Sequence, residues 1–381
     1  MPLTDRDLEA ILRCPISGQR LRRMTEAELA GFNRMIVAGE ASYPDSTPAA
    51  RAISAGLVSE DGRYVYRDDE GVLFLLSEWA ISSQVGKDDF VQLDEFTKSV
   101  RDFYDEVGWK RLDEGEFNDA IRYEDLRPVS SRYIHECHLR VLRYVDSDGQ
   151  YMLDAGSGPI QYPEYLLYSR GYRRRICVDI SLAALREAQR NLRDKGVYIL
   201  ADISNLPFAD ESMDSVVSLH TIYHIPRERQ DAAIQEIHRV LAPGRRAAIV
   251  YSWKDSSLNR VLLTPLRIKR LGERILRKAD LRREALIPST TRAGRELFAE
   301  PQSYRWFITR PWDFDYQIAV WRTVSVDVLR FYIHDRLFGR QLLRILFAFE
   351  ERFPGLCAAI GQYGLISIRK SEFSVPNNRR Q

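Results

Sequence analysis

The stretch Tyr151-Met-Leu-Asp-Ala-Gly-Ser-Gly-Pro159 constrains the fold of this chain most, because an apolar run there ends at a carboxylate and then passes through two glycines. The run that ends at Asp154 predicts a buried strand, and Gly156 and Gly158 permit a tight turn that brings backbone close to a ligand. A strand followed by a glycine-rich turn and a helix is typical of the nucleotide-binding corner of a doubly wound α/β sheet. The stretch therefore predicts a ligand-binding α/β fold.

The glycine spacing disfavours a dinucleotide as the ligand. Dinucleotide sites use Gly-x-Gly-x-x-Gly and hold the pyrophosphate at a helix N-terminus, but the third position here is Gln161. The carboxylate of Asp154 would also repel a phosphate in a partly buried site. S-adenosylmethionine has no phosphate and carries an ammonium and a sulfonium. An acidic residue at the end of the strand therefore suits this ligand better.

The segment Asp154-Ala-Gly156-Ser-Gly158 resembles the first motif of the class I S-adenosylmethionine-dependent methyltransferases, an acidic residue followed by any residue, Gly, any residue and Gly. Ile160, preceded by a proline, stands where the family often has a third glycine. The resemblance extends, motif by motif, over about residues 100 to 255. It implies a doubly wound, seven-stranded, mostly parallel sheet and an enzyme that uses S-adenosylmethionine as its cofactor.

Two further predicted strands lead to carboxylates. The second strand, from Arg175, ends at Asp179, which follows the first glycine by about the interval at which a doubly wound fold brings an acid to the ribose hydroxyls. The third strand, 197–201, leads to Asp202 and Ile203. In the methyltransferases that this segment resembles, the acid bonds the adenine amino group and the next residue packs on the ring. Capping of a turn is the alternative role for Asp202.

An aromatic segment precedes the predicted core. Phe103-Tyr104-Asp is similar to a Phe-Tyr-Asp segment that often covers the cofactor in this family, although packing on the sheet would also explain Tyr104. The expected cofactor-binding residues are Tyr104, Asp154, Ala155, Gly156, Gly158, Asp179, Ile180, Asp202, Ile203 and Leu219.

The candidate catalytic residues follow the fourth predicted strand, 213–219. Methyl transfer is an in-line displacement, so the protein mainly aligns the nucleophile at roughly 3–3.5 Å. A hydroxyl or amine acceptor must also lose a proton, for which a histidine is a suitable base. We expect His220 to be this base, with Tyr223 beside it and His224 anchoring the loop. The segment lacks the Asn-Pro-Pro-Tyr or Asp-Pro-Pro-Tyr motif of methylases that act on exocyclic or amide nitrogens.

Residues 1–80 resemble the zinc-ribbon family of small methyltransferase activator subunits. Of the four ligand positions only Cys14 remains, because Ser17, Ser59 and Gly62 occupy the others. One thiolate cannot hold structural zinc, so we expect a degenerate zinc-ribbon-like domain without metal. A stabilising cap is favoured over a platform for a substrate or partner. The resemblance to this zinc-ribbon family leaves methylation of rRNA or tRNA as an alternative function of the protein.

The rest of the chain is expected to form the methyltransferase domain, 90–370, with a helical insertion at 254–312 and a disordered tail at 371–381. One amphipathic helix is predicted over 326–353, between the two closing strands. Within the insertion, residues 265–283 alternate apolar and basic residues at helical spacing. This pattern fits peripheral contact with a membrane, binding of an anionic substrate or RNA, or a solvated basic face.

Composition narrows the classes of partner. The net charge of +2 over 381 residues gives no global polyanion-binding signature, so nucleic acid is a less favoured partner. No apolar run approaches the roughly 20 residues of a transmembrane segment, and the start lacks the pattern of a signal peptide, so we expect a cytoplasmic protein. The four cysteines lie far apart, which indicates neither a disulfide framework nor a local metal site.

These observations predict methyl transfer to a hydroxyl or amine of a small or lipid-linked acceptor. A noncatalytic cofactor-binding scaffold that activates a partner enzyme is an alternative from a different class, because it would carry the same cofactor-binding residues. The sequence identifies neither the acceptor nor the oligomeric state.

Overall fold

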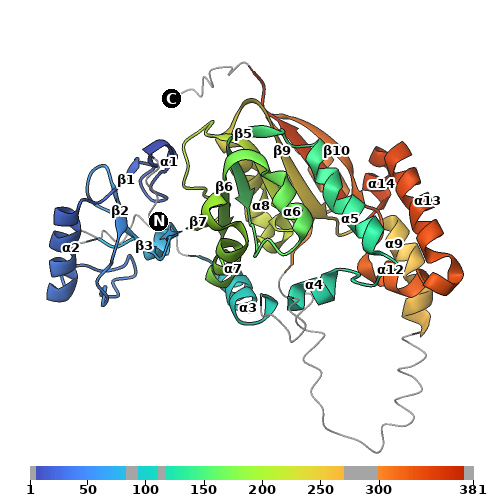
Figure 1. Cartoon of the computed structure of the whole chain (residues 1–381), viewed down its shortest axis with the longest axis horizontal. Coiled ribbons are helices and arrows are strands. Elements are labelled where there is room, and N and C mark those ends of the chain that lie inside the picture. The colour runs from blue at the N-terminus through green and yellow to red at the C-terminus, as the bar shows by residue number, and fades with distance from the viewer. Residues whose placement is uncertain (1–5, 83–92, 110–116, 270–298, 373–381) are drawn as a thin grey trace, which may run out of the picture.

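The computed structural model describes residues 6–82, 93–109, 117–269 and 299–372. Its centre is one mixed sheet of eleven strands in the order β1-β2-β3-β4-β7-β6-β5-β8-β9-β11-β10 (Figure 1). The strands are β1 Leu21–Arg23, β2 Gly56–Ser59, β3 Val65–Asp69, β4 Val72–Phe74, β5 Asp148–Ala155, β6 Gly171–Asp179, β7 Gly196–Leu200, β8 Met213–Leu219, β9 Leu241–Ser252, β10 Asp315–Arg322 and β11 Tyr363–Arg369.

Seven of these strands form the Rossmann-like part that the sequence predicts. Strands β7, β6, β5, β8 and β9 are parallel, and β11 and β10 close the edge in antiparallel pairing. From β5 the chain proceeds outward to β6 and β7 on one side and later to β8 and β9 on the other. The order of strands therefore reverses between β5 and β8, and such a switch point is where open α/β sheets bind ligands.

Helices cover both faces of this part of the sheet (Figure 1). On one face α8 (Gln230–Val240) packs through Ile234 and Ile237 into one hydrophobic core. On the other face α5 (Ser131–Arg140), α6 (Pro163–Tyr168) and α7 (Leu182–Leu192) pack into a second core. Helix α7 begins after Ser181, whose Oγ accepts a hydrogen bond from the backbone N of Ala184 at 3.1 Å.

The sheet is longer than the seven strands expected, because the N-terminal strands join it. Val72 of β4 pairs in parallel with Tyr198 of β7, and β3, β2 and β1 follow outward in antiparallel pairing. Helices α1 (Arg6–Ile11) and α2 (Glu26–Ala38) belong to this N-terminal part. The segment after α1 is bonded to the loop that follows β7, since the backbone N of Arg13 donates to the carbonyl of Pro207 at 2.9 Å.

Cys14, at the expected degenerate zinc position, is buried and free, with its Sγ 3.2 Å from the hydroxyl of Tyr66. In the described ranges, no group of three or more His, Cys, Asp or Glu side chains is arranged to hold a metal ion. Nor is any helix within those ranges long and apolar enough to cross a membrane.

The single helix expected over 326–353 is wrong. The segment contains α12 (Val326–Tyr332) and α13 (Gly339–Arg352), and α14 (Pro354–Ile360) follows directly. Phe338 adopts a left-handed φ of 56°, and a Cβ at Gly339 would lie 2.7 Å from the carbonyl oxygen of His334. The chain therefore turns tightly before α13 begins.

The remaining α-helices among the described residues are α3 Glu95–Phe103, α4 Asn118–Tyr123, α9 Ser257–Leu262 and α11 Tyr304–Ile308, and a π-helical turn spans Tyr104–Gly108. Most of the basic segment 265–283, and the tail expected to be disordered from 371 except its first two residues, lie outside the described residues.

Candidate active site

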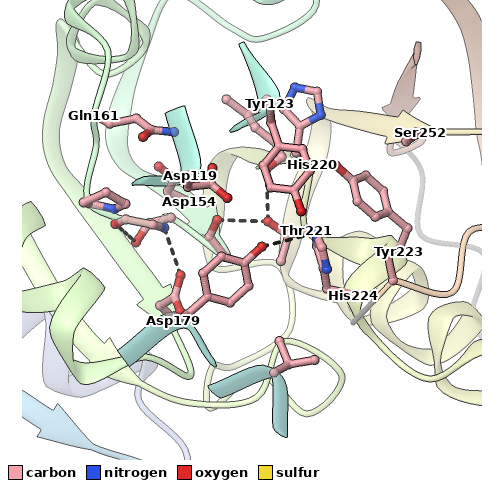
Figure 2. Close-up of a pocket in the computed structure, with 18 of the residues that line it drawn as sticks. Asp119, Tyr123, Asp154, Gln161, Asp179, His220, Thr221, Tyr223, His224 and Ser252 are labelled. Atoms are coloured by element: carbon pink, nitrogen blue, oxygen red, sulfur yellow. Dashed lines mark hydrogen bonds between the residues drawn. The ribbon is translucent and has the colours of Figure 1, made fainter. Parts of the chain in front are cut away.

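A cavity of about 310 Å³ lies at the carboxyl ends of the central parallel strands. Figure 2 shows that its labelled residues come from five places: α4, the end of β5 with the turn that follows it, the end of β6, the loop after β8 and the end of β9. These segments are far apart in the sequence, and the strand order brings them together at the switch point.

The glycine turn after β5 forms one wall of the cavity. Gly156 and Gly158 have φ values of 77° and 55°, which residues with a Cβ rarely adopt. A Cβ at Gly156 would lie only 2.1 Å from Cγ2 of Thr221, and one at Gly158 would meet the Trp109 ring at 3.4 Å. The turn is thus packed between the loop after β8 and Trp109, with no room for larger residues at Gly156.

Asp154 lines the cavity, but its charge is already balanced. Its Oδ2 accepts a hydrogen bond from Nε of Arg175 at 3.0 Å and a second one from Nη2 of the same guanidinium. The side chains of both residues are buried. A carboxylate that is paired with an arginine attracts a second cation only weakly. Asp154 was expected to face the positive charge of the cofactor, but Arg175 supplies most of the positive charge beside it.

Asp179, at the end of β6, is held by backbone donors. Its Oδ2 accepts from the N–H of Gly158 and its Oδ1 accepts from the N–H of Ser181, each at 2.9 Å. Burial raises the pKa of Asp179 to about 6, although these two hydrogen bonds oppose the shift. Each carboxylate oxygen keeps a further lone pair that a hydroxyl donor in the cavity could use.

Asp202 lines the cavity together with Ile203 and also caps its own turn, which was the alternative expected for it. Its Oδ1 accepts from the backbone N of Ser204 at 2.9 Å, and its Oδ2 pairs with Arg229. Arg229 also bonds Oδ2 of Asp94 at 3.1 Å, before α3. The arginine thereby ties the loop after β7 to the segment that leads to Tyr104.

The loop after β8 carries the three expected catalytic residues, and all three line the cavity. His220 has a left-handed φ of 60°, a conformation that residues with a side chain rarely adopt. Its ring lies 4.5 Å from that of Trp321 and 5.4 Å from that of Tyr363, centroid to centroid. Burial, and next the charge of Arg322, lower the pKa of His220 to about 3. The imidazole is therefore neutral near pH 7 but a weak base.

Tyr104, which follows α3, contacts this loop. Its hydroxyl is 3.4 Å from Nε2 of His224, and its ring stacks on Trp109 with centroids 5.0 Å apart. Ala155 is the one expected cofactor residue that is absent from the wall, because it is buried in β5, where its carbonyl accepts a hydrogen bond from Ser218 at 2.7 Å. The other nine expected cofactor residues line the cavity.

Several residues in the wall were not expected from the sequence, and Asp119 on α4 is chemically the most distinctive of them. Burial raises its pKa to about 7, while a hydrogen bond from Gln161 opposes the shift. Figure 2 shows Asp119 and Tyr123, both on α4, among the residues that line the cavity. A carboxyl group with this pKa exchanges a proton near neutral pH. No motif surrounds Asp119 in the sequence, so only the fold reveals it.

A buried ion pair completes the wall at the end of β10. Nη1 of Arg322 pairs with Oε1 of Glu124, and both side chains are at most 5% exposed. Burial raises the pKa of Glu124, but the charge of Arg322 and a bond from His138 outweigh it and bring the pKa to about 2. Nε of Arg322 is buried and has no hydrogen-bond partner among the described residues.

The part of the chain that forms this cavity is similar to known proteins. Residues 153–249 match the family model described as a methyltransferase domain. The chain is 28% identical over 170 residues to methyltransferase GfsG of Streptomyces halstedii, covering 41% of this chain and 58% of that protein. It is 30% identical over 141 residues to O-methyltransferase resE of Aspergillus sclerotiorum, covering 35% and 51%. The chain thus spans about half the length of these curated relatives.

Among solved structures, phosphoethanolamine N-methyltransferase 2 of Haemonchus contortus, in complex with S-adenosyl-L-methionine, is similar at 17% identity and a TM-score of 0.42. This likeness covers 77% of the present chain and 63% of that chain.

The residues of the cavity fit S-adenosyl-L-methionine. The glycine turn exposes backbone where a Cβ would clash, the buried carboxylate of Asp179 retains lone pairs for hydroxyl donors, and Asp119 offers a second carboxyl group. Residues 153–249 of this chain match a methyltransferase domain, and the cofactor is S-adenosyl-L-methionine.

Proposed function

We propose that this protein transfers a methyl group to a hydroxyl or amine of a small or lipid-linked acceptor. The observation that supports this proposal is that one continuous cavity is lined both by Asp179 and Asp202 and by His220 and Tyr223. Figure 2 draws Asp179 on one side of this cavity and His220 and Tyr223 on the other. A cofactor and an acceptor could therefore meet inside it.

The wall of the cavity limits the kind of acceptor. Its aromatic residues, among them Tyr104, Tyr223, Trp321 and Tyr363, exclude water from the reacting groups. A volume of about 310 Å³ has to contain the cofactor as well as the reacting part of the acceptor. We therefore infer that the acceptor presents its nucleophile on a narrow terminal group, which a small molecule or the end of a lipid-linked chain can do.

The cofactor-binding roles follow from the hydrogen bonds. We assign the ribose hydroxyls to Asp179, whose orientation is fixed by the N–H groups of Gly158 and Ser181. We assign the adenine edge to Asp202 and its face to Ile203, with Ile180 and Leu219 as further apolar contacts. Tyr104 would cover the bound molecule from the α3 side.

The bound cofactor supplies a methyl group on a sulfonium: the acceptor atom bonds to its carbon, and the carbon–sulfur bond breaks with the electron pair left on sulfur. The chain's task is to align the acceptor and remove its proton. We assign the role of base to Asp119. One of its carboxylate oxygens takes the proton of the acceptor and then releases it to solvent. A pKa of about 7 suits a base at neutral pH, whereas the pKa of about 3 for His220 does not.

The histidines and Tyr223 then position the acceptor. The ring of His220 is held between Trp321 and Tyr363, and its neutral nitrogens can donate to or accept from a hydroxyl or amine. His224 contacts Tyr104. Loss of these groups should raise the KM for the acceptor more than it lowers kcat at saturation.

The experiment that tests the proposal supplies S-adenosyl-L-methionine with a deuterated methyl group to the full chain, together with acceptors that carry a terminal hydroxyl or amine. Mass spectrometry then measures S-adenosylhomocysteine and the labelled product. Formation of both in equal amounts is the expected result. Cofactor binding without product, across small, lipid-linked and RNA acceptors, would contradict the proposal and favour a scaffold that activates another enzyme. Labelled RNA alone would favour an RNA methyltransferase.

A further inference from the structure

A face of exposed apolar side chains lies on the helices that follow β10. Seven large apolar side chains between residues 337 and 356 are 42–73% exposed. We call them the α13 face: Leu337, Phe338, Leu342, Ile345, Phe349, Phe353 and Leu356.

The spacing in α13 places these side chains together. Leu342, Ile345 and Phe349 recur at intervals of three and four residues, so they share one side of the helix, and Phe338 directly precedes it. Ile345, in the middle, is 67% exposed. Single exposed apolar residues are ordinary on a protein surface, whereas a contiguous row marks a surface that is covered in use.

The opposite side of α13 is firmly attached to the domain. Glu350 is fully buried and accepts hydrogen bonds from the hydroxyl of Tyr133 at 2.7 Å, the backbone N of Thr323 at 2.8 Å and Nη2 of Arg140 at 3.1 Å. Leu343 packs in the core beside it. The α13 face is therefore presented by a fixed helix, and Figure 1 shows that helix on the outside of the molecule, beyond α5.

The charges beside the α13 face are positive. Arg336, Arg344 and Arg352 are exposed, and no carboxylate in the described parts of the chain forms an ion pair with them. The nearby acids have other partners. Asp335 pairs with Arg340 at 2.9 Å, and Glu351 pairs with Arg140 at 2.9 Å and also with Arg143.

We propose that the α13 face docks on an anionic lipid surface. A helix with an apolar row and flanking arginines lies in the membrane interface, with the apolar side chains between the lipid chains and the guanidinium groups at the phosphates. A second copy of the chain fits less well, because two-fold pairing of α13 would bring the arginines of both copies together. This surface lies outside the cavity, so the inference does not depend on the proposed methyl transfer.

Co-sedimentation of the full chain with vesicles tests this proposal. We expect binding to vesicles of phosphatidylcholine with one third phosphatidylglycerol, weaker binding to phosphatidylcholine alone, and loss of binding at high salt. Ile345→Asp should weaken binding at least about tenfold, because it removes an apolar group that inserts between the lipid chains and adds a negative charge that the anionic lipid repels. Arg344→Gln should weaken it about fivefold, as expected for one cation near an anionic surface.

Val37→Asp is the matched control, because Val37 is 84% exposed on α2, far from α13 in the sequence. This variant should bind vesicles like the unchanged protein. Equal binding by Ile345→Asp and Val37→Asp, or no preference for the anionic vesicles, would overturn the proposal. Light scattering supplies a further outcome: a dimer that Ile345→Asp dissociates would show that a second copy occupies the face instead of lipid.

Discussion

Asp154 and Arg175 form a buried ion pair directly beneath the glycine turn, with Nε of Arg175 3.0 Å from Oδ2 of Asp154. Nη1 of the same arginine also donates to the carbonyl of Tyr165 on α6. The guanidinium therefore connects the end of β5 to the helix that follows the turn. This pair gives Asp154 an architectural role, in addition to its place in the wall of the cavity.

Removing Arg175 should destabilise the domain strongly. Arg175→Met leaves the carboxylate of Asp154 buried without a partner, which costs about 3–5 kcal/mol of unfolding free energy. Urea unfolding measures this loss. In the double variant Asp154→Asn with Arg175→Met the loss should be smaller, because no charge is left unpaired.

Arg340→Met is the control, because it breaks an exposed pair with Asp335 and should cost under about 1 kcal/mol of unfolding free energy. Similar losses for Arg175→Met and Arg340→Met would contradict this view of the pair.

Replacing Asp179 should weaken cofactor binding. Asp179→Asn replaces one of the two acceptor oxygens with an amide donor, which then faces either a backbone N–H or the ribose. The affinity for S-adenosylhomocysteine should therefore fall about 10- to 100-fold. Isothermal titration with S-adenosylhomocysteine measures the change, and Asp148→Asn, at the exposed start of β5, is the control. An affinity that is the same in both variants would remove Asp179 from the cofactor site.

The raised pKa of Asp179 predicts how cofactor affinity depends on pH. The carboxyl group is charged above pH 6 and becomes protonated as the pH falls through about 6, when it loses acceptor capacity. Affinity should therefore decrease between pH 7 and pH 5 in the unchanged protein. Asp179→Asn should lack this part of the dependence. A pH dependence that persists unchanged in the variant would assign the titration to another group.

Gly156 should be intolerant of any side chain. Gly156→Ala combines a φ of 77° with a Cβ only 2.1 Å from Thr221, so either the turn or the loop after β8 has to move. We expect a loss of more than about 1 kcal/mol in stability and loss of cofactor binding. Gly355→Ala is the matched control, because a Cβ there meets nothing within 4 Å. Thermal unfolding and titration of both variants check the prediction, and equal behaviour would refute it.

Asp119 should determine the pH dependence of turnover. If its carboxylate takes the proton of the acceptor, kcat rises with pH through about 7 and then levels off. Asp119→Asn should lower kcat about 100- to 10,000-fold and abolish this rise, with the affinity for S-adenosylhomocysteine retained. Asp102→Asn, whose side chain is 59% exposed on α3, should behave like the unchanged enzyme. If His220→Ala removed the pH dependence and Asp119→Asn did not, His220 would be the base.

The central part of the fold could be predicted because each local signal agrees with the others. Apolar runs that end at Asp154 and Asp179 and before Asp202 are strands β5, β6 and β7, and these strands are neighbours in the sheet. The spacing of apolar residues and the residue types found in turns are local properties of a sequence, so they locate strands well. Nine of the ten cofactor residues expected from these motifs and from the family resemblance line one cavity.

Other features depend on partners that are distant in the sequence. Arg175 follows two further arginines and therefore looks solvated in the sequence, yet the fold buries it against Asp154. Asp119 acquires its raised pKa only from burial beside residues of other elements. The attachment of β4 to β7 is another long-range pairing, which no periodicity within residues 1–80 reveals. Such partners emerge only when the chain is folded.

The most direct test of the central claim is the titration of S-adenosyl-L-methionine into the full chain, followed by competition with S-adenosylhomocysteine. We expect one bound molecule per chain, displaced by the competitor, with binding lost in Gly156→Ala and weakened in Asp179→Asn. A chain that binds neither compound, or that binds them equally well in both variants, would contradict the assignment of this cavity to the cofactor.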